Sequence, residues 1–114
     1  MGEINGDALR GHLDTLILSV LRRGEGHGFD ILRRLESAGC GALRLKEGSL
    51  YPALYRLEAA GMIRGAWEES HSKRRGPRRR VYRLTTKGGA KLKHARGDFA
   101  QFVTIVGGII GVPA

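Results

Sequence analysis

The chain is poor in the residues on which catalysis, metal binding and disulfide frameworks depend. Its 114 residues include one cysteine, Cys40, and four scattered histidines, at positions 12, 27, 71 and 94. One cysteine cannot form an internal disulfide, and this spacing of cysteine and histidines matches no zinc site. No nucleophile–base pair or phosphate-binding glycine loop stands at a recognisable spacing. We therefore expect no metal, no cofactor and no enzymatic activity, with Cys40 an inert residue in a turn.

Long hydrophobic runs are also missing. The stretch 99–113 carries no charge, but a bilayer span needs about 20 apolar residues. The stretch Leu13–Leu21 is interrupted by Thr15 and Ser19 and does not read as a signal peptide. Basic residues precede the stretch 99–113 instead of following one face of it, which favours a seam between two chains over a membrane-surface anchor. We expect a cytoplasmic protein with no membrane partner.

Acidic residues are scarce in the second half of the chain. Residues 1–62 hold eight Lys or Arg and eight Asp or Glu, whereas residues 63–114 hold twelve basic and three acidic residues. The formal net charge of +9 therefore lies wholly in the second half. A local excess of this kind indicates a polyanionic partner.

Apolar periodicity predicts three helices in the first half. Residues 8–23 form an amphipathic helix that Asp7 can cap, and a second helix runs from His27 to Ala38 with Phe29, Leu32 and Leu35 facing inward. The third helix covers Lys46 to Ala60, with Gly61 as its C-terminal cap and Pro52 tolerated in its first turn.

The period then changes from 3.6 to 2. Residues 63–68 and 81–84 read as two strands, and the segment between them is rich in Ser, Gly, Pro and Arg. Two such strands make a β-hairpin with a long basic tip. Three helices followed by this hairpin predict a mainly α fold with a small β-hairpin: a winged helix-turn-helix over residues 1–84.

A last helix, capped by Thr85 or Thr86 and reaching about Ile110, makes up residues 85–114 and completes one compact unit. Its apolar positions step by 3, 4, 3, 4 and 3, the heptad spacing of two helices that meet lengthwise. At about 1.5 Å per residue the helix is longer than the small core can cover, which predicts dimerisation. The expected dimer residues are Leu9, Leu13, Leu16, Ile17, Leu92, Ala95, Phe99, Phe102, Val106 and Ile109.

The hairpin tip and the third helix supply the candidate DNA contacts. Six of the eight residues from Lys73 to Arg80 are basic, a pattern suited to phosphates along a duplex, although a solvated loop is the alternative for a charge run alone. In a helix-turn-helix the second helix of the pair enters the major groove. The tyrosines of this helix could instead pack under the wing, and Trp67 is expected in the core or an interface. The candidate set is Lys46, Ser49, Tyr51, Pro52, Tyr55, Arg56, Lys73, Arg74, Arg75, Arg78, Arg79 and Arg80.

The segments 11–18, 26–31, 47–58, 61–63 and 82–85 together resemble PadR-type transcriptional regulators, over roughly residues 9–106. The block Glu47–Glu58 is the most specific of them. The resemblance is to the short subfamily, whose single C-terminal helix dimerises against the first helix of the partner. It implies a homodimer that binds a pseudo-palindromic operator in double-stranded DNA and represses transcription, and in many relatives a small aromatic or cationic effector at the dimer interface releases the DNA.

Two departures from the family pattern bear on these implications. Gly89 follows Gly88 where relatives usually have arginine, and the last helix has no tryptophan to stack a flat ligand, a place that Phe99 or Phe102 could take. The leading hypothesis is a sequence-specific, ligand-responsive repressor that acts as a homodimer. The alternative is a sensor or protein-interaction module that binds DNA weakly.

Overall fold

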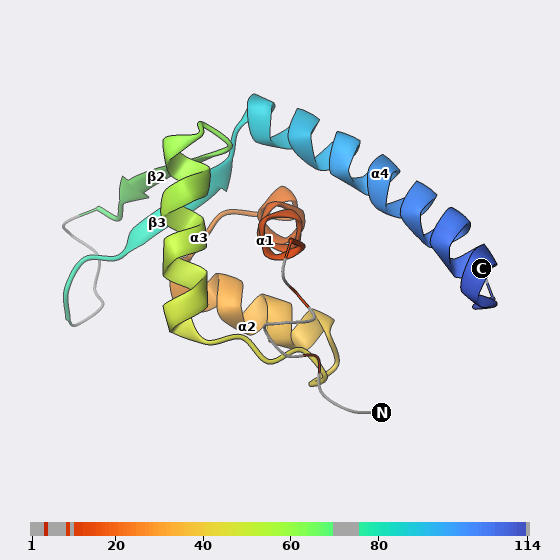
Figure 1. Ribbon diagram of the computed structural model, residues 1–114. Coiled ribbons are helices and arrows are strands. Elements are labelled where there is room, and N and C mark those ends of the chain that lie inside the picture. The colour runs from red at the N-terminus through yellow and green to blue at the C-terminus, as the bar shows by residue number, and fades with distance from the viewer. Residues whose placement is uncertain (1–3, 5–8, 10, 70–75, 114) are drawn as a thin grey trace.

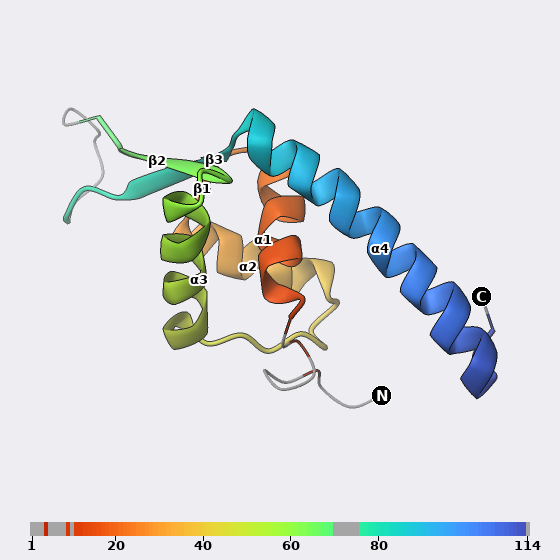
Figure 2. The same ribbon diagram turned by 45° about the horizontal axis from the view of Figure 1, so that its top comes forward.

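In the part of the chain that the structure describes, four helices and three short strands are present. The computed structural model describes residues 4, 9, 11–69 and 76–113. In chain order the elements are α1 Leu13–Arg22, β1 Gly26–His27, α2 Gly28–Ala38, α3 Glu47–Ala59, β2 Ile63–Trp67, β3 Arg80–Leu84 and α4 Thr86–Ile110. Helices α1, α2 and α3 form the body, the β2–β3 hairpin projects from one end, and α4 runs away from the body (Figure 1; Figure 2). This arrangement confirms the predicted winged helix-turn-helix with an added C-terminal helix.

The core lies where α1, α2 and α3 meet under the sheet. Among the described residues no polar or charged side chain is buried, so the core needs no internal hydrogen-bond network. Branched aliphatic side chains that recur at helical spacing account for it, as the apolar periodicity predicted. The largest fully buried side chains are Ile17, Leu18, Ile31, Leu50, Leu54 and Ile63.

The sheet has one strand more than the predicted hairpin. Its order is β1-β3-β2, antiparallel throughout, with Gly26 and Gly65 on either side of Tyr82. Strand β1 has two residues, too few to show a period of 2, and for this reason the sequence pattern does not reveal it. Its pairing places His27, at the start of α2, beside the base of the wing.

Helix α1 is shorter than predicted. It begins at Leu13 and not near residue 8, and the expected cap Asp7 lies outside the described residues. Leu9 precedes the helix, and its side chain is buried in the core. The apolar pattern of 8–23 therefore combines a packed turn with a helix.

Two aromatic residues lie where sequence reasoning did not expect them. Phe29 is exposed, with the Arg33 guanidinium 5.7 Å from its ring centroid, because the buried stripe of α2 runs through Gly28, Ile31 and Leu35. Trp67 is 58% exposed at the end of β2, so the expectation of a core position is wrong for it.

Helix α3 tolerates a proline beyond its first turn, contrary to the prediction. Pro52 is the sixth residue of the helix, and it removes the amide that would bond to the Gly48 carbonyl. Pro52 is exposed, so its ring lies on the solvent side of the helix.

At the C-terminal end of α3, Gly61 has φ +76°, and the Met62 amide donates to the Leu57 carbonyl at 2.9 Å. This is a Schellman ending, in agreement with the predicted glycine cap.

Helix α4 begins and ends as predicted. The Thr85 hydroxyl accepts from the Gly88 amide at 3.0 Å, which caps the first turn. Gly111, with φ +85°, ends the helix after Ile110.

Candidate nucleic-acid interface

Helix α3 has two faces of different character. Leu50, Ala53, Leu54 and Leu57 are buried in the body. The opposite side is exposed and includes the six residues that the sequence singled out on this helix and at its start: Lys46, Ser49, Tyr51, Pro52, Tyr55 and Arg56. Hydroxyl, aromatic and cationic groups thus share one accessible surface.

The two tyrosines of this face differ. Tyr55 is 78% exposed and is free to reach a ligand. Tyr51 is 47% exposed, and its ring lies so close to Gly28 that an added Cβ there would be 2.7 Å from Tyr51 Cε1. Tyr51 therefore packs against the start of α2, and part of its surface remains accessible.

An ion pair joins Arg56 of α3 to α1. The Arg56 Nη2 lies 2.8 Å from Oδ1 of Asp14 on α1. Both side chains are largely exposed, so the pair adds little stability. The contact orients Arg56 without burying it.

The wing is described from Gly76 onward, and its predicted contacts Lys73, Arg74 and Arg75 lie outside the described residues. At the base of the hairpin, Arg78 Nε donates to the Glu68 carbonyl at 3.0 Å, and the Arg79 amide donates to Glu68 Oε1 at 3.0 Å. The Arg79 guanidinium turns toward α2, where its Nη1 is 2.5 Å from His27 Nε2. The base of the wing thereby holds two arginines in defined positions.

Arg80 belongs to a different environment from its neighbours. Its Nη2 is 2.5 Å from Oε2 of Glu58 on α3, and its guanidinium lies 5.5 Å from the Trp67 ring centroid. The hydrogen bond with Glu58 raises the pKa of the guanidinium. Gly65 makes room for this contact, because a Cβ there would lie 2.6 Å from Arg80 Nε. The structure therefore gives Arg80 an internal partner, whereas the sequence grouped it with the DNA contacts.

Tyr82 lies under the wing. Its side chain is buried, and burial, followed by the negative charge of Glu58, raises the pKa of its phenol. Tyr82 therefore keeps its proton at neutral pH and acts as a core residue beneath the hairpin.

The end of α3 is joined to the start of α4 by hydrogen bonds. The Thr85 hydroxyl donates to the Gly61 carbonyl at 2.6 Å, and Lys87 Nζ donates to the Ala60 carbonyl at 2.8 Å. The Met62 carbonyl packs against Gly88 so closely that any side chain at Gly88 would overlap it. We call these contacts the α3–α4 joint. They satisfy carbonyls that the end of α3 leaves without an intrahelical donor.

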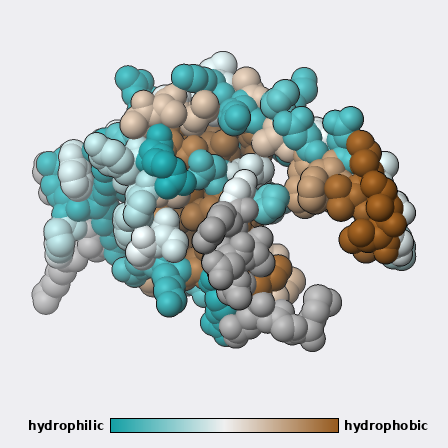
Figure 3. All heavy atoms as spheres, in the orientation of Figure 1, coloured by the Kyte–Doolittle hydropathy of each residue, from teal (hydrophilic) through white to brown (hydrophobic). Residues whose placement is uncertain are grey.

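The far half of α4 is an exposed apolar surface, visible as the brown region at its end (Figure 3). Of the predicted dimer residues, Phe99, Phe102 and Ile109 are exposed, and Leu13, Leu16, Ala95 and Val106 are partly buried. Leu9, Ile17 and Leu92 are enclosed in the core of their own chain and offer no surface to a partner. The predicted dimer residues of α4 therefore fall into two groups. Those near the start of the helix are buried or partly buried in their own chain, and those toward its end are mostly exposed.

Within the described part of the chain, no group of three or more His, Cys, Asp or Glu side chains could hold a metal ion. No helix of that part is long and apolar enough to cross a membrane.

Comparison with known proteins decides the family. The model of the transcriptional regulator PadR-like family matches residues 17–94. The chain belongs to this family. Its members are transcriptional regulators and not enzymes, so the geometry above is that of a PadR-like DNA-binding protein. A search of curated proteins finds no significant match.

Solved structures agree with the assignment to the PadR-like family. A transcriptional regulator from Clostridium thermocellum is 30% identical, with a TM-score of 0.80 over 91% of this chain and 95% of the other. A PadR-like transcription factor from Bacteroides fragilis is 30% identical, with a TM-score of 0.75 over 90% and 94%. A PadR family regulator from Clostridium difficile is 27% identical, with a TM-score of 0.77 over 88% and 99%.

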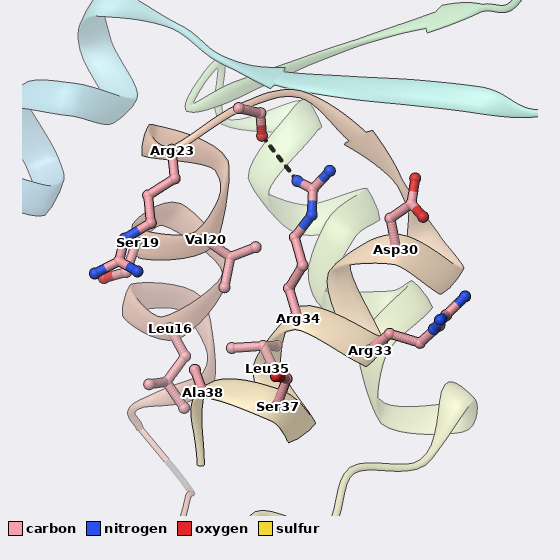
Figure 4. A pocket seen from close by; sticks show the side chains of 11 residues that line it. Leu16, Ser19, Val20, Arg23, Asp30, Arg33, Arg34, Leu35, Ser37 and Ala38 are labelled. Carbon is pink, nitrogen blue, oxygen red and sulfur yellow. Dashed lines mark hydrogen bonds between the residues drawn. The ribbon is translucent and has the colours of Figure 1, made fainter. Parts of the chain in front are cut away.

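This PadR-like chain also has a groove of about 890 Å³ between α1 and α2 (Figure 4). Leu16, Val20 and Leu35 form its apolar part. Arg34 crosses it and donates to the carbonyls of Gly24 and Glu25, at 3.0 Å each. Leu16 is also among the predicted dimer residues, so the groove adjoins the face of α1 that we expect a partner to cover.

Sequence reasoning missed the residues that connect the elements: His27, Gly28, Glu58 and the α3–α4 joint. The available signals were weak. A glycine inside a strand indicates that another group approaches the backbone closely. Gly65 is such a glycine, but the sequence does not reveal that the approaching group is the Arg80–Glu58 pair.

Proposed function

We propose that this PadR-like regulator acts as a homodimer that binds a pseudo-palindromic operator, with α3 of each subunit in the major groove. The observation that carries the proposal is the exposed face of α3 beside the fixed arginines of the wing base. Base edges in the major groove are read by hydrogen-bonding side chains, and phosphates by arginines. The half-sites would lie about 34 Å apart, one turn of the duplex.

The dimer is supported by the far half of α4. Its exposed apolar side chains gather toward the end of the helix, where the described residues of the chain leave them largely accessible. Water contact of so much apolar surface is unfavourable, and a second copy of the same helix offers the matching heptad spacing. The proposed division is residues 1–84 for DNA and 85–114 for dimerisation.

We further propose that the dimer represses transcription and responds to a small-molecule effector. Bound across a promoter, such a dimer would exclude RNA polymerase. His12 and Phe99 meet edge to face with ring centroids 5.5 Å apart, and Phe99 and Phe102 stack at 6.5 Å. This aromatic cluster beside the proposed interface supports binding of a flat, aromatic effector. As a regulator of transcription the protein would work in the cytoplasm, beside the chromosome.

Selection of DNA from a randomised library with the purified protein tests the central proposal. We expect a two-fold symmetric motif with half-sites one turn apart, and sedimentation at tens of micromolar should give a dimer. Absence of any gel retardation at micromolar protein and moderate salt would favour the alternative of a sensor or interaction module.

Tyr55→Ala is expected to reduce operator binding by about 10-fold or more and to change binding to random DNA little. The side chain is the most exposed of the α3 aromatics, and one good base contact contributes about 1–3 kcal/mol of discrimination. Fluorescence anisotropy with operator and scrambled duplexes measures both constants. Equal losses on the two duplexes would contradict a role in reading sequence.

Arg79→Ala is expected to weaken operator and random DNA by similar factors. Loss of one phosphate contact should lower the slope of log K against log salt by about 1. Binding measured at five salt concentrations gives the slope for both proteins. A loss confined to the operator, with an unchanged slope, would contradict a backbone contact.

A further inference from the structure

An ion pair joins α3 to the wing at the point where the β2–β3 ladder ends. Strand β2 packs against α3 (Figure 1; Figure 2). The last residue of β2, Trp67, lies opposite the first residue of β3, Arg80, and Arg80 in turn contacts Glu58 in the last turn of α3. The chain leaves the sheet for the wing after Trp67 and returns at Arg80, so a contact at this pair fixes the direction in which the wing starts.

Two kinds of contact hold the Arg80 guanidinium. Its Nε lies 3.4 Å from Glu58 Oε1 and its Nη2 lies 2.5 Å from Glu58 Oε2, so both carboxylate oxygens are engaged. Its Cζ lies 5.5 Å from the centroid of the Trp67 ring, within the range of a cation–π contact. The Glu58 and Arg80 side chains are each 32% exposed, so salt screens this pair less than a pair on the open surface. A forked contact at a partly buried position defines one orientation of the guanidinium.

The backbone of β2 leaves space for this contact at Gly65. A Cβ at Gly65 would lie 2.6 Å from Arg80 Nε and 2.9 Å from Glu58 Oε1. Both atoms belong to the ends of side chains, so an added methyl group would displace the ion pair and not the backbone. We call Glu58, Arg80 and Trp67 the α3–wing bridge.

The α3–wing bridge also balances one positive charge on the surface that α3 and the wing share. Arg80 follows Arg79 in the chain, but the charge of Arg80 is paired with that of Glu58. A free arginine at this place would attract any phosphate, regardless of the DNA sequence. In the bridge the same guanidinium connects the wing to α3. Recognition of one sequence requires these two elements to meet backbone and bases in a fixed arrangement.

We propose that Glu58 and Trp67 are positioning residues, which hold the wing at a fixed angle to α3 through Arg80 and thereby set the preference for the operator over other DNA. The proposal rests on the proposed function, because it takes operator DNA as the ligand of both elements. Neither residue needs to touch DNA for this role. Its signature is a loss of operator binding together with a gain of binding to random DNA when Glu58 loses its charge.

Glu58→Gln is expected to lower operator binding by about 10-fold, because the wing loses the hydrogen-bonded charge pair that orients it. Binding to random duplexes should rise by about 3-fold, because the released Arg80 can neutralise a phosphate. Fluorescence anisotropy with both duplexes measures the two constants. Simple destabilisation of the fold would lower both of them.

Gly65→Ala tests the bridge without a change of charge. It should lower operator binding by a factor similar to that of Glu58→Gln and leave binding to random duplexes unchanged, with a wild-type circular dichroism spectrum. Glu47→Gln is the matched control, because it removes the same charge from an exposed position in the first turn of α3, outside the bridge. It should change both constants by the same factor and keep the wild-type ratio of operator to random binding.

Trp67 is the single tryptophan of the chain, so its fluorescence reports on the bridge in the free protein. Quenching by acrylamide, which is uncharged, should increase in Glu58→Gln and in Gly65→Ala, because Arg80 no longer covers the ring, and should stay unchanged in Glu47→Gln. Trp67→Ala should weaken operator binding, and Trp67→Phe, which keeps a ring for Arg80, should restore most of it. Wild-type quenching in both bridge variants would overturn the bridge itself.

The binding constants separate failure of the bridge from failure of the proposed function. A wild-type ratio of operator to random binding in Glu58→Gln and Gly65→Ala, or an equal loss on both duplexes, would overturn the positioning role and leave the proposed function intact. If the wild type binds no duplex even at low salt, the proposed function is wrong, and the positioning role is wrong with it.

Discussion

Phe102→Glu is expected to convert the protein from a dimer to a monomer and to abolish detectable operator binding. Phe102 is 57% exposed in the single chain, so the substitution should leave the fold intact. In the proposed dimer it would bury a carboxylate without a partner, which costs about 3–5 kcal/mol and raises the dimer dissociation constant by about 10²-fold or more. A monomer would then bind only one half-site and lose the effective concentration that the second subunit provides.

Sedimentation and circular dichroism separate the two effects of Phe102→Glu. The spectrum and the unfolding transition at low concentration should match those of the wild type, while the sedimenting mass halves. Gln101→Glu places the same charge on the adjacent exposed position, which is outside the heptad seam, and should remain a dimer. A dimer of wild-type affinity in Phe102→Glu would show that this surface of α4 does not form the subunit interface.

Gly88→Ala and Gly89→Ala are expected to have opposite effects on stability, although they are adjacent. A Cβ at Gly88 would overlap the Met62 carbonyl, whereas the nearest atom to a Cβ at Gly89 is 3.9 Å away. Overpacking typically lowers the free energy of unfolding by about 1–3 kcal/mol. Alanine in place of glycine inside a helix raises it by about 1 kcal/mol.

Urea unfolding followed by circular dichroism measures both changes. Because the α3–α4 joint contains Gly88, we also expect Gly88→Ala to weaken operator binding by more than its stability loss explains, and Gly89→Ala to leave operator binding unchanged. Equal stability of the two variants would contradict the close packing at Gly88.

Much of this fold could be predicted because its signals are local. The apolar seam of α3, the glycine after α3 and the Thr85 cap depend on residues within a few positions of one another. The exposed side of α3 followed directly from its buried side.

The rest depends on contacts between distant residues. Arg80 stands in a run of arginines and looks like its neighbours, and only the approach of Glu58, 22 positions earlier, distinguishes it. The same holds for the contact of His27 with Arg79, 52 positions later, because only the pairing of the two-residue strand β1 with β3 brings them together. The core alternative for Trp67 is wrong because the edge of a short sheet exposes even a large aromatic side chain.

The α3–α4 joint makes the long C-terminal helix a lever for the recognition helix. With 25 residues at about 1.5 Å each, α4 is about 37 Å long. A tilt of about 5° at the joint would therefore move the far end by about 3 Å. In the proposed dimer, a joint that moves as one body would turn α3 by the same small angle. Packing changes among Phe99, Phe102 and their neighbours would in this way alter the angle at which each subunit meets DNA, without any change in the wing or in α3 itself.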